Sequence, residues 1–218
     1  MAQTMGPTAA LAGIPAGLQA QGVWAGRRQL FVRFAAEAET ATMYTADALA
    51  HELKRSMSRS TFHSISISGR DPLANVEYLQ ATFDRPDLPL PVMLDCDGLR
   101  PREIAALAPV VKLVQVTLDT ASFDANADRV FESIGEAARA GLPHALVLNS
   151  DEKMTDAHIL RVVERGHATS TAVSVVIHPG PSTPVDRDRR WMTLFERVAA
   201  LHSDVRLALK LPPPTGMR

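Results

Sequence analysis

Short apolar stretches alternate along the chain with longer amphipathic ones. The short stretches are rich in Val, Ile and Leu and predict strands at Leu30–Phe34, Ser64–Ser68, Pro91–Cys96, Leu113–Leu118, Ala145–Asn149, Val173–His178 and Val205–Leu209. Most of them are too apolar for one face to meet water. They are therefore expected to be buried on both faces of a parallel sheet.

The segments between these strands have helical periodicity. They predict helices at Thr45–Ser58, Asn126–Ala140, Thr155–Arg165 and Arg187–His202. The alternation predicts an α/β fold in a single domain of 218 residues, with residues 1–17 as a candidate flexible N-terminus. A doubly wound sheet and an open, partial (β/α) barrel both fit the pattern. In either fold the functional site is expected at the carboxyl ends of the strands.

Charge and cysteine content exclude several kinds of site. A formal net charge of -1 gives no overall electrostatic signal for nucleic acid or an anionic membrane. No apolar run reaches the length of a membrane span, and we expect a soluble, cytoplasmic protein. Cys96 is the only cysteine, and the histidines lack metal-binding spacing, so no metal site is predicted.

Three strand ends carry polar residues that could meet a ligand. The turn SISISGRDPL contains Gly69 and Asp71, and the turn LDCDGL contains Asp95 and Asp97. Asp71 could bind a ligand amine or cap the next helix, and the two later acids could bind a ribose or a cation or line a solvated turn. His178 ends the sixth strand and could line the same mouth or belong to the core.

The order of these turns carries a resemblance to a known family. The stretch AGLQAQGVWAGRRQLFVRFA, residues 16–35, is similar to the N-terminal segment of the 7-carboxy-7-deazaguanine synthases, radical S-adenosylmethionine (SAM) enzymes that read Gln-Gly-Glu-Gly, Gly-Arg and Phe-Val-Arg-Phe-Ala there. Residues 67–73 resemble their Thr-Gly-Gly-Glu-Pro-Leu turn, and residues 94–99 their Glu-Thr-Asn-Gly-Thr turn. The resemblance extends to the terminal VRLALKLPPPTGMR and implies a single-domain partial (β/α) barrel of the radical SAM type.

The resemblance also shows what this chain lacks. The family has three cysteines after Phe-Val-Arg-Phe-Ala that hold an iron–sulfur cluster, whereas this chain reads AEAETATMYT at residues 36–45. Cys96, on another strand, cannot replace three thiolates. The comparison therefore implies no iron–sulfur cluster and no radical chemistry by the family route.

The SAM-contacting turn of the family is altered in this chain as well. Gly69 is kept, but Arg70 and Asp71 stand where the family has Gly and Glu, which argues against SAM binding. No cofactor is therefore expected.

The substrate region of the family is partly kept. Gln19, Gln21 and Gly22 lie in the segment that matches Gln-Gly-Glu-Gly, with an amide in place of the carboxylate. Arg33 matches an arginine that contacts a substrate carboxylate, although an ion pair at a strand end explains it equally well. The candidate ligand-binding residues are Gln19, Gln21, Gly22, Arg33, Gly69, Arg70, Asp71, Asp95, Asp97 and His178, and no catalytic residue is assigned.

These observations support three hypotheses of function. The first is a cluster-less pseudoenzyme that acts as a binding or partner subunit, in a homodimer or with another protein of a cofactor or modified-nucleoside pathway. The second is an enzyme with polar, non-radical chemistry on a small anionic or purine-like substrate in the barrel mouth. The third, sensing of SAM or a nucleotide without turnover, is weakened by Arg70. Partners are therefore a protein or a small molecule, without nucleic acid or membrane.

Overall fold

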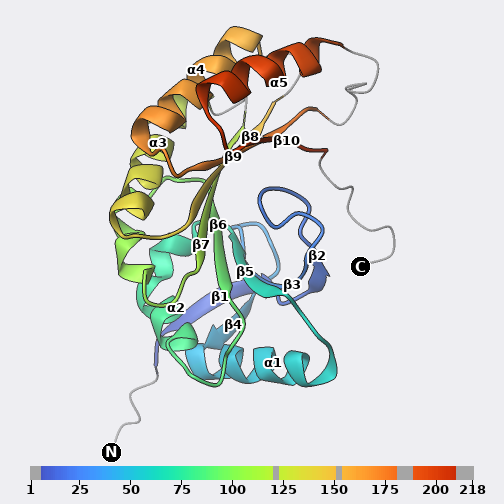
Figure 1. The fold of residues 1–218 in the computed structure, drawn as a ribbon. Helices are drawn as coiled ribbons and strands as arrows, with labels where there is room; N and C mark the ends of the chain where they lie inside the picture. Colours follow the sequence, from blue (N-terminus) through green and yellow to red (C-terminus); the bar gives the residue numbers. More distant parts are fainter. Residues whose placement is uncertain (1–5, 120–122, 151–153, 181–188, 210–218) are drawn as a thin grey trace, which may run out of the picture.

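The chain folds around one central sheet with helices along one side of it (Figure 1). The computed structural model describes residues 6–119, 123–150, 154–180 and 189–209. The strands are β1 (Thr8–Gly13), β2 (Ala16–Leu18), β3 (Arg28–Phe34), β4 (Thr42–Thr45), β5 (Ser64–Gly69), β6 (Val92–Cys96), β7 (Leu113–Asp119), β8 (His144–Asn149), β9 (Ser174–His178) and β10 (Val205–Leu207). The helices are α1 (Ala46–Arg59), α2 (Val76–Phe83), α3 (Phe123–Arg139), α4 (Asp156–Thr169) and α5 (Arg189–Leu201).

The sheet is mixed, and its larger part is parallel. Its strand order is β10-β9-β8-β7-β6-β5-β3-β1-β4, with β2 paired to β3 outside this path. From β3 to β10 the neighbours run parallel, whereas β1 is antiparallel to both β3 and β4. Because β4 and β10 lie at opposite edges of this order, the sheet is open. The predicted α/β fold with a parallel sheet is confirmed, and its architecture is consistent with a partial barrel.

One face of the parallel strands carries the main hydrophobic core. Ile65, Leu94, Val116, Leu148 and Ile177 occupy alternate positions on successive strands and are all buried. The helices cover this face, as the arc of ribbons from α1 to α5 in Figure 1 shows. Amphipathic helices supply the matching apolar side, so this layer contains most of the apolar surface that folding removes from water.

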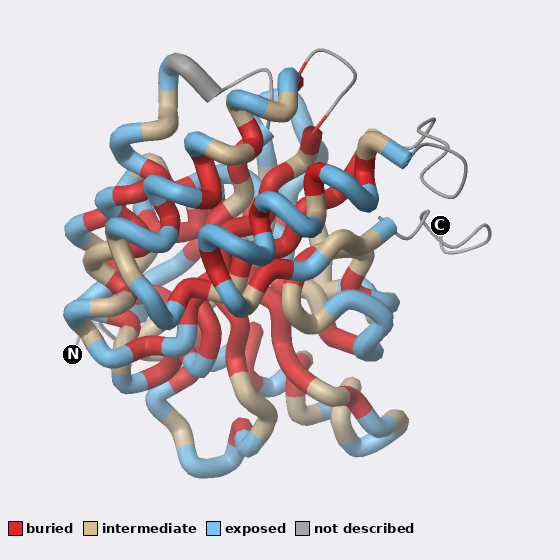
Figure 2. The backbone as a smooth tube through the Cα atoms, turned by 45° about the horizontal axis from the view of Figure 1, so that its top comes forward, coloured by how far each residue is buried: buried red, intermediate tan, exposed pale blue. Residues whose placement is uncertain are grey.

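The opposite face, called here the inner face, is buried but partly polar. Gln29, Ser66, Gln115 and His178 lie on it and are at most 1% exposed. The loop of residues 19–27, between β2 and β3, covers this face, and it lies on the side of the sheet away from the helices (Figure 1). Figure 2 shows the resulting pattern, in which buried strand backbone lies inside an exposed outer layer.

The N-terminal part of the sheet differs from the sequence-based prediction. Residues 8–13 form β1 in the expected flexible N-terminus, and Leu11 is only 1% exposed. Residues 42–45, expected in a loop, form β4 and pair with β1 in the register Thr8↔Thr45. These strands are short and held by antiparallel partners distant in sequence, so local periodicity gave no signal for them.

The helices follow the predicted positions with shifted ends. Thr45 caps α1, because its Oγ1 accepts a hydrogen bond from the Ala48 backbone amide at 3.1 Å. Helix α3 begins at Phe123, earlier than predicted, and α4 continues to Thr169. Helix α2 was not predicted from the sequence. None of the helices in the described part of the chain is long and apolar enough to cross a membrane.

Candidate functional site

The turn after β5 is shaped by two residues in the left-handed backbone region. Gly69 has φ +97°, and a Cβ there would lie 2.3 Å from the backbone oxygen of Phe34, so only glycine fits. Asp71 also has a positive φ, 44°, which a short polar side chain tolerates. Arg70, between them, donates its backbone amide to the Phe34 oxygen at 3.1 Å. The turn is thereby fixed against the end of β3.

The turn after β6 is held by a carboxylate and a helix. Asp97 Oδ1 accepts a hydrogen bond from the Leu99 backbone amide at 3.1 Å. The next residue, Gly98, has φ +73° and packs so closely on β7 and α3 that a Cβ would lie 2.7 Å from Val116 Cγ1. Ser133 of α3 donates its hydroxyl to the Gly98 oxygen at 2.8 Å. This contact fixes the position of α3 relative to the turn.

These two turns and α3 surround a cavity of about 480 Å³. Its lining consists of Arg70, Asp71, Asp97, Leu99, Arg100 and Arg129. Arg100 makes a bidentate ion pair with Asp71, with Nε to Oδ1 at 2.7 Å and a terminal nitrogen to Oδ2 at 2.8 Å. The hydrogen bond and the charge of Asp71 raise the pKa of the Arg100 guanidinium. Arg100 is thus a permanent cation with a fixed orientation.

The other two guanidiniums of the cavity are not neutralised. Within residues 6–119, 123–150, 154–180 and 189–209, neither Arg70 nor Arg129 has a carboxylate partner within ion-pair distance, and both are exposed. Asp97 contributes a negative charge, but its side chain is engaged with the Leu99 amide. Three cations and two carboxylates therefore meet here, and two of the cations can bind an anion.

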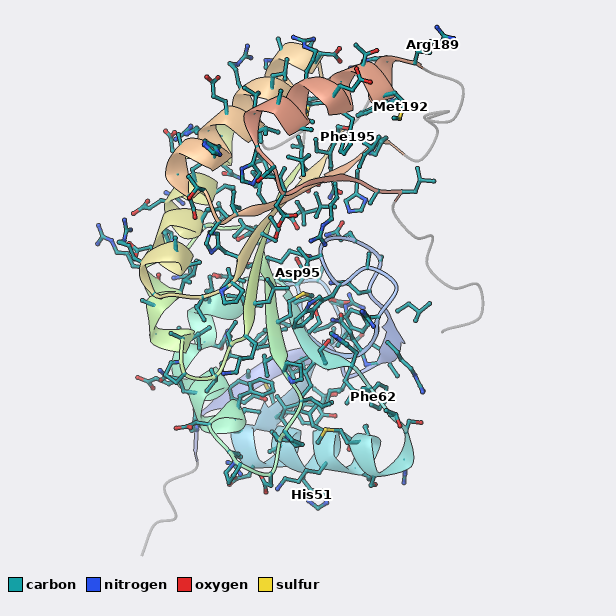
Figure 3. The ribbon with its side chains drawn as sticks, in the orientation of Figure 1. His51, Phe62, Asp95, Arg189, Met192 and Phe195 are labelled. Carbon is teal, nitrogen blue, oxygen red and sulfur yellow. The ribbon has the colours of Figure 1, made fainter. Side chains whose placement is uncertain are left out.

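A second group of polar side chains lies on the inner face. Thr117 Oγ1 accepts from Gln21 Nε2 at 3.3 Å and donates to Asp95 Oδ1 at 3.4 Å. Asn149 Nδ2 donates to Gln21 Oε1 at 3.3 Å and to Asp119 Oδ1 at 2.7 Å. Figure 3 shows Asp95 on the side of the sheet away from the helices. This inner-face network connects three neighbouring strands to one glutamine of the loop of residues 19–27.

Backbone amides of the same loop also bind the inner face. His178 Nε2 accepts from the Gly22 amide at 3.1 Å, and Gln115 Oε1 accepts from the Val23 amide at 3.3 Å. A Cβ at Gly22 would lie 1.7 Å from Gln115 Oε1, so any other residue here would have to displace the Gln115 side chain that accepts from the Val23 amide.

Most of the predicted ligand-binding residues therefore separate into two groups. Gly69 shapes the turn beside the arginine-lined cavity, and Arg70, Asp71 and Asp97 line that cavity. The inner-face group brings together Gln21, Gly22, Asp95 and His178.

Two predicted residues belong to neither group. Gln19 is buried, and its side chain accepts from the Ala20 amide, so it shapes the loop. Arg33 pairs with Glu39 at 3.1 Å on the surface, as the ion-pair interpretation requires.

Sequence reasoning missed several members of both groups. Arg100 and Arg129 line the cavity, and Gln115, Thr117 and Asn149 support the inner-face network. Polar residues inside otherwise apolar strands were the available signal for the inner face. Arg129 gave none, because an arginine on an amphipathic helix is ordinary.

Two groups near these sites have shifted proton affinities. Burial raises the pKa of the Cys96 thiol to about 12, so this cysteine is a neutral core residue. Burial lowers the pKa of His63, and the charge of Arg27 lowers it further. Among the described residues, no group of three or more His, Cys, Asp or Glu side chains is placed to hold a metal ion.

Comparisons with known proteins give no family for this chain. No family model matches, and no curated protein matches. One similar solved structure is a type I 3-dehydroquinate dehydratase from Clostridium difficile, with TM-score 0.45, 10% identity, and coverage of 75% of this chain and 70% of that chain. Another is the 3-keto-D-glucoside 4-epimerase from E. coli, with TM-score 0.32, 16% identity, and coverage of 76% of this chain and 88% of that chain. At these values neither likeness extends to activity.

The radical SAM assignment is wrong. The similar structures are a dehydratase and an epimerase, and no family model supports the resemblance. Its physical origin lies in the residues that carried it. Gly69 and Gly98 adopt positive φ in tight turns at the ends of strands, and Gly22 does so in the loop of residues 19–27. Such turns arise from backbone geometry in unrelated α/β folds, so inferences about cluster and SAM drawn from that family do not carry over.

Proposed function

We propose that this protein binds a small anionic molecule in the arginine-lined cavity between the turns after β5 and β6 and helix α3. The observation that carries the proposal is the pair of guanidiniums, Arg70 and Arg129, that line one cavity with Arg100 and have no carboxylate partner among the described residues. Arg100 is paired with Asp71, so the excess positive charge comes from Arg70 and Arg129, and an anion placed between these two guanidiniums offsets it.

The chemistry of the lining favours a phosphate- or carboxylate-bearing ligand. Guanidinium presents paired N–H donors that match two oxygens of either group. Asp71 holds Arg100 in a fixed orientation, so one donor set is ordered before the ligand arrives. Leu99 adds an apolar contact, and a cavity of about 480 Å³ has the size of a small-molecule site.

Catalysis at this site and association with a protein partner or a second copy of the chain stay predictions. Asp71 is committed to Arg100 and Asp97 to the Leu99 amide. Both carboxylates have defined structural roles, so binding is the function that the geometry supports best.

Calorimetric titration with inorganic phosphate, pyrophosphate and citrate at low ionic strength tests the proposal. Arg70→Gln and Arg129→Gln should each weaken binding about five- to tenfold, since each removes one charge-assisted contact at a partly solvated site. Arg197→Gln removes the same charge from an exposed position of α5 and should leave the affinity unchanged. Asp97→Asn keeps an oxygen for the Leu99 amide, loses a negative charge and should tighten binding.

Two results would contradict the proposal. The first is the absence of saturable binding for all three anions. The second is an equal affinity for Arg129→Gln and Arg197→Gln, which would show that binding reflects overall charge and does not involve the cavity.

A further inference from the structure

The loop of residues 19–27 is closed by its own backbone hydrogen bonds and packs on the inner face. Its ends are joined by two backbone hydrogen bonds of 2.9 Å, from the Gln19 amide to the Arg27 oxygen and from the Gly26 amide to the Gln19 oxygen. A further backbone bond of 3.0 Å joins the Arg27 amide to the Trp24 oxygen. These three bonds lie within the loop and close it on itself, in addition to the bonds that it makes to the strands beneath it.

The strands beneath the loop present hydrogen-bonding groups where a packed core would present apolar ones. Gln115, Thr117, Asn149 and His178 come from three neighbouring strands, β7, β8 and β9, and project to the same face. Gln115 and His178 are at most 1% exposed. Buried polar side chains cost free energy unless they are paired, and converging polar groups in a concave setting are typical of ligand sites.

Gln21 occupies the centre of this polar group. Its carbonyl oxygen accepts from Asn149 Nδ2, and its amide nitrogen donates to Thr117 Oγ1, both at 3.3 Å. The two bonds therefore engage both the oxygen and the nitrogen of one primary carboxamide. The nearby carboxylates of Asp95 and Asp119, each bonded to a member of this group, disfavour an anion at the same position.

We infer that the inner face is a second ligand site, specific for a neutral carboxamide or a similar paired N–H and C=O group, and that Gln21 of the chain's own loop fills it. A ligand of this class enters when the loop moves away from the inner face. The ligand then makes the contacts to Thr117 and Asn149 that Gln21 otherwise makes. This site is separate from the arginine-lined cavity and opposite to it in charge preference.

Chemical rescue tests the chemistry of the site. Gln21→Ala removes a group equivalent to acetamide. Acetamide at about 0.5 M, chosen because ligands this small bind weakly, should therefore raise the Tm of Gln21→Ala by a few degrees more than that of the wild type. Acetate has nearly the same shape but carries a charge and no N–H donor, so it should give no specific rise. Phosphate affinity at the arginine-lined cavity should be the same in both proteins, which separates this test from that of the proposed function.

A pair of glycine variants tests displacement of the loop. Gly22 and Gly26 both have φ +79°, but a Cβ at Gly22 meets Gln115 at 1.7 Å, whereas a Cβ at Gly26 meets nothing within 4 Å. Gly22→Ala must displace the Gln115 side chain and so break its bond with the Val23 amide. It should therefore loosen the loop, accelerate hydrogen exchange of the Val23 amide at least tenfold and gain the acetamide-dependent rise in Tm. Gly26→Ala carries the same backbone strain and should show neither effect.

Three outcomes overturn the inference. In the first, acetamide and acetate shift the Tm of Gln21→Ala equally. In the second, Gly22→Ala fails to fold while Gly26→Ala folds, which would make the loop an obligatory part of the core. In the third, Gly22→Ala folds with the Val23 amide exposed to exchange but does not respond to acetamide.

Discussion

The glycine in the turn after β6 gives a quantitative test of how the candidate site is held together. Gly98 has φ +73°, and a Cβ there would lie 2.7 Å from Val116 Cγ1 and 3.1 Å from the Cα of Val130. Gly141, after α3, has a similar φ of +69°, but a Cβ there would meet nothing within 4 Å. The two positions share the backbone constraint and differ in the space around the added methyl group.

The expected losses of stability follow from these two terms. Alanine in the left-handed region costs about 1–2 kcal/mol, and both variants bear this cost. Gly98→Ala must in addition push apart β7 and the backbone of α3, and overpacking of this kind costs about 1–3 kcal/mol. We therefore expect losses of about 2–5 kcal/mol for Gly98→Ala and about 1–2 kcal/mol for Gly141→Ala.

Urea denaturation with equal m values measures both losses directly. Because Ser133 binds the Gly98 oxygen, a shift of the turn also moves α3, and anion affinity should fall in Gly98→Ala but not in Gly141→Ala. Equal destabilisation of the two variants would refute the reasoning, since it would mean that the close approach to Val116 and Val130 has no energetic consequence.

Three further predictions concern the core and its titration. Cys96 should resist thiol reagents at pH 8 in the native protein. Because its pKa is raised to about 12 only in the folded state, the free energy of unfolding should fall above pH 9 as the thiol of the unfolded chain ionises. Cys96→Ala should reduce this fall. The pKa of His63 is lowered in the folded state, so stability should fall as the pH drops through 6.5, and His63→Gln should lessen that loss in urea titrations at pH 7.5 and 5.5. Leu11→Ala should cost about 2–4 kcal/mol because Leu11 is 1% exposed. Leu18→Ala, at a position 46% exposed, should cost less than about 0.5 kcal/mol. Urea denaturation of the two variants compares these losses, and equal losses would mean that β1 is not part of the folded core.

The parallel strands could be predicted because their signal is local. A segment such as Val114–Leu118 contains buried residues on the helix face that no surface segment would carry, and the helix that follows supplies its own periodicity. Strands β1 and β4 had no such signal, since each is short and stabilised by a partner more than thirty residues away. Their existence follows from tertiary pairing and not from propensity.

The candidate site was predicted only where it is encoded in a turn. Arg70, Asp71 and Asp97 follow directly after strands, so the rule that sites lie at carboxyl ends of strands identified them. Arg129 reaches the same cavity from within a helix, through the docking of α3 on Gly98, and nothing near it in the sequence indicates this. The family assignment was wrong for a related reason. It relied on glycine spacing in turns, which reports the geometry of the turns and not the chemistry of a site.

The two faces of the parallel strands differ in polarity, and the inferred carboxamide site lies on the more polar one. In β5, Ile65 and Ile67 face the helices, while Ser64 and Ser66 alternate with them on the loop-covered side. With the inferred site on the inner face, neighbouring positions of a single strand would come under separate selective pressures, one for keeping the chain folded and one for the choice of ligand. A scaffold arranged in this way can exchange its specificity residue by residue while its helix-facing layer stays as it is.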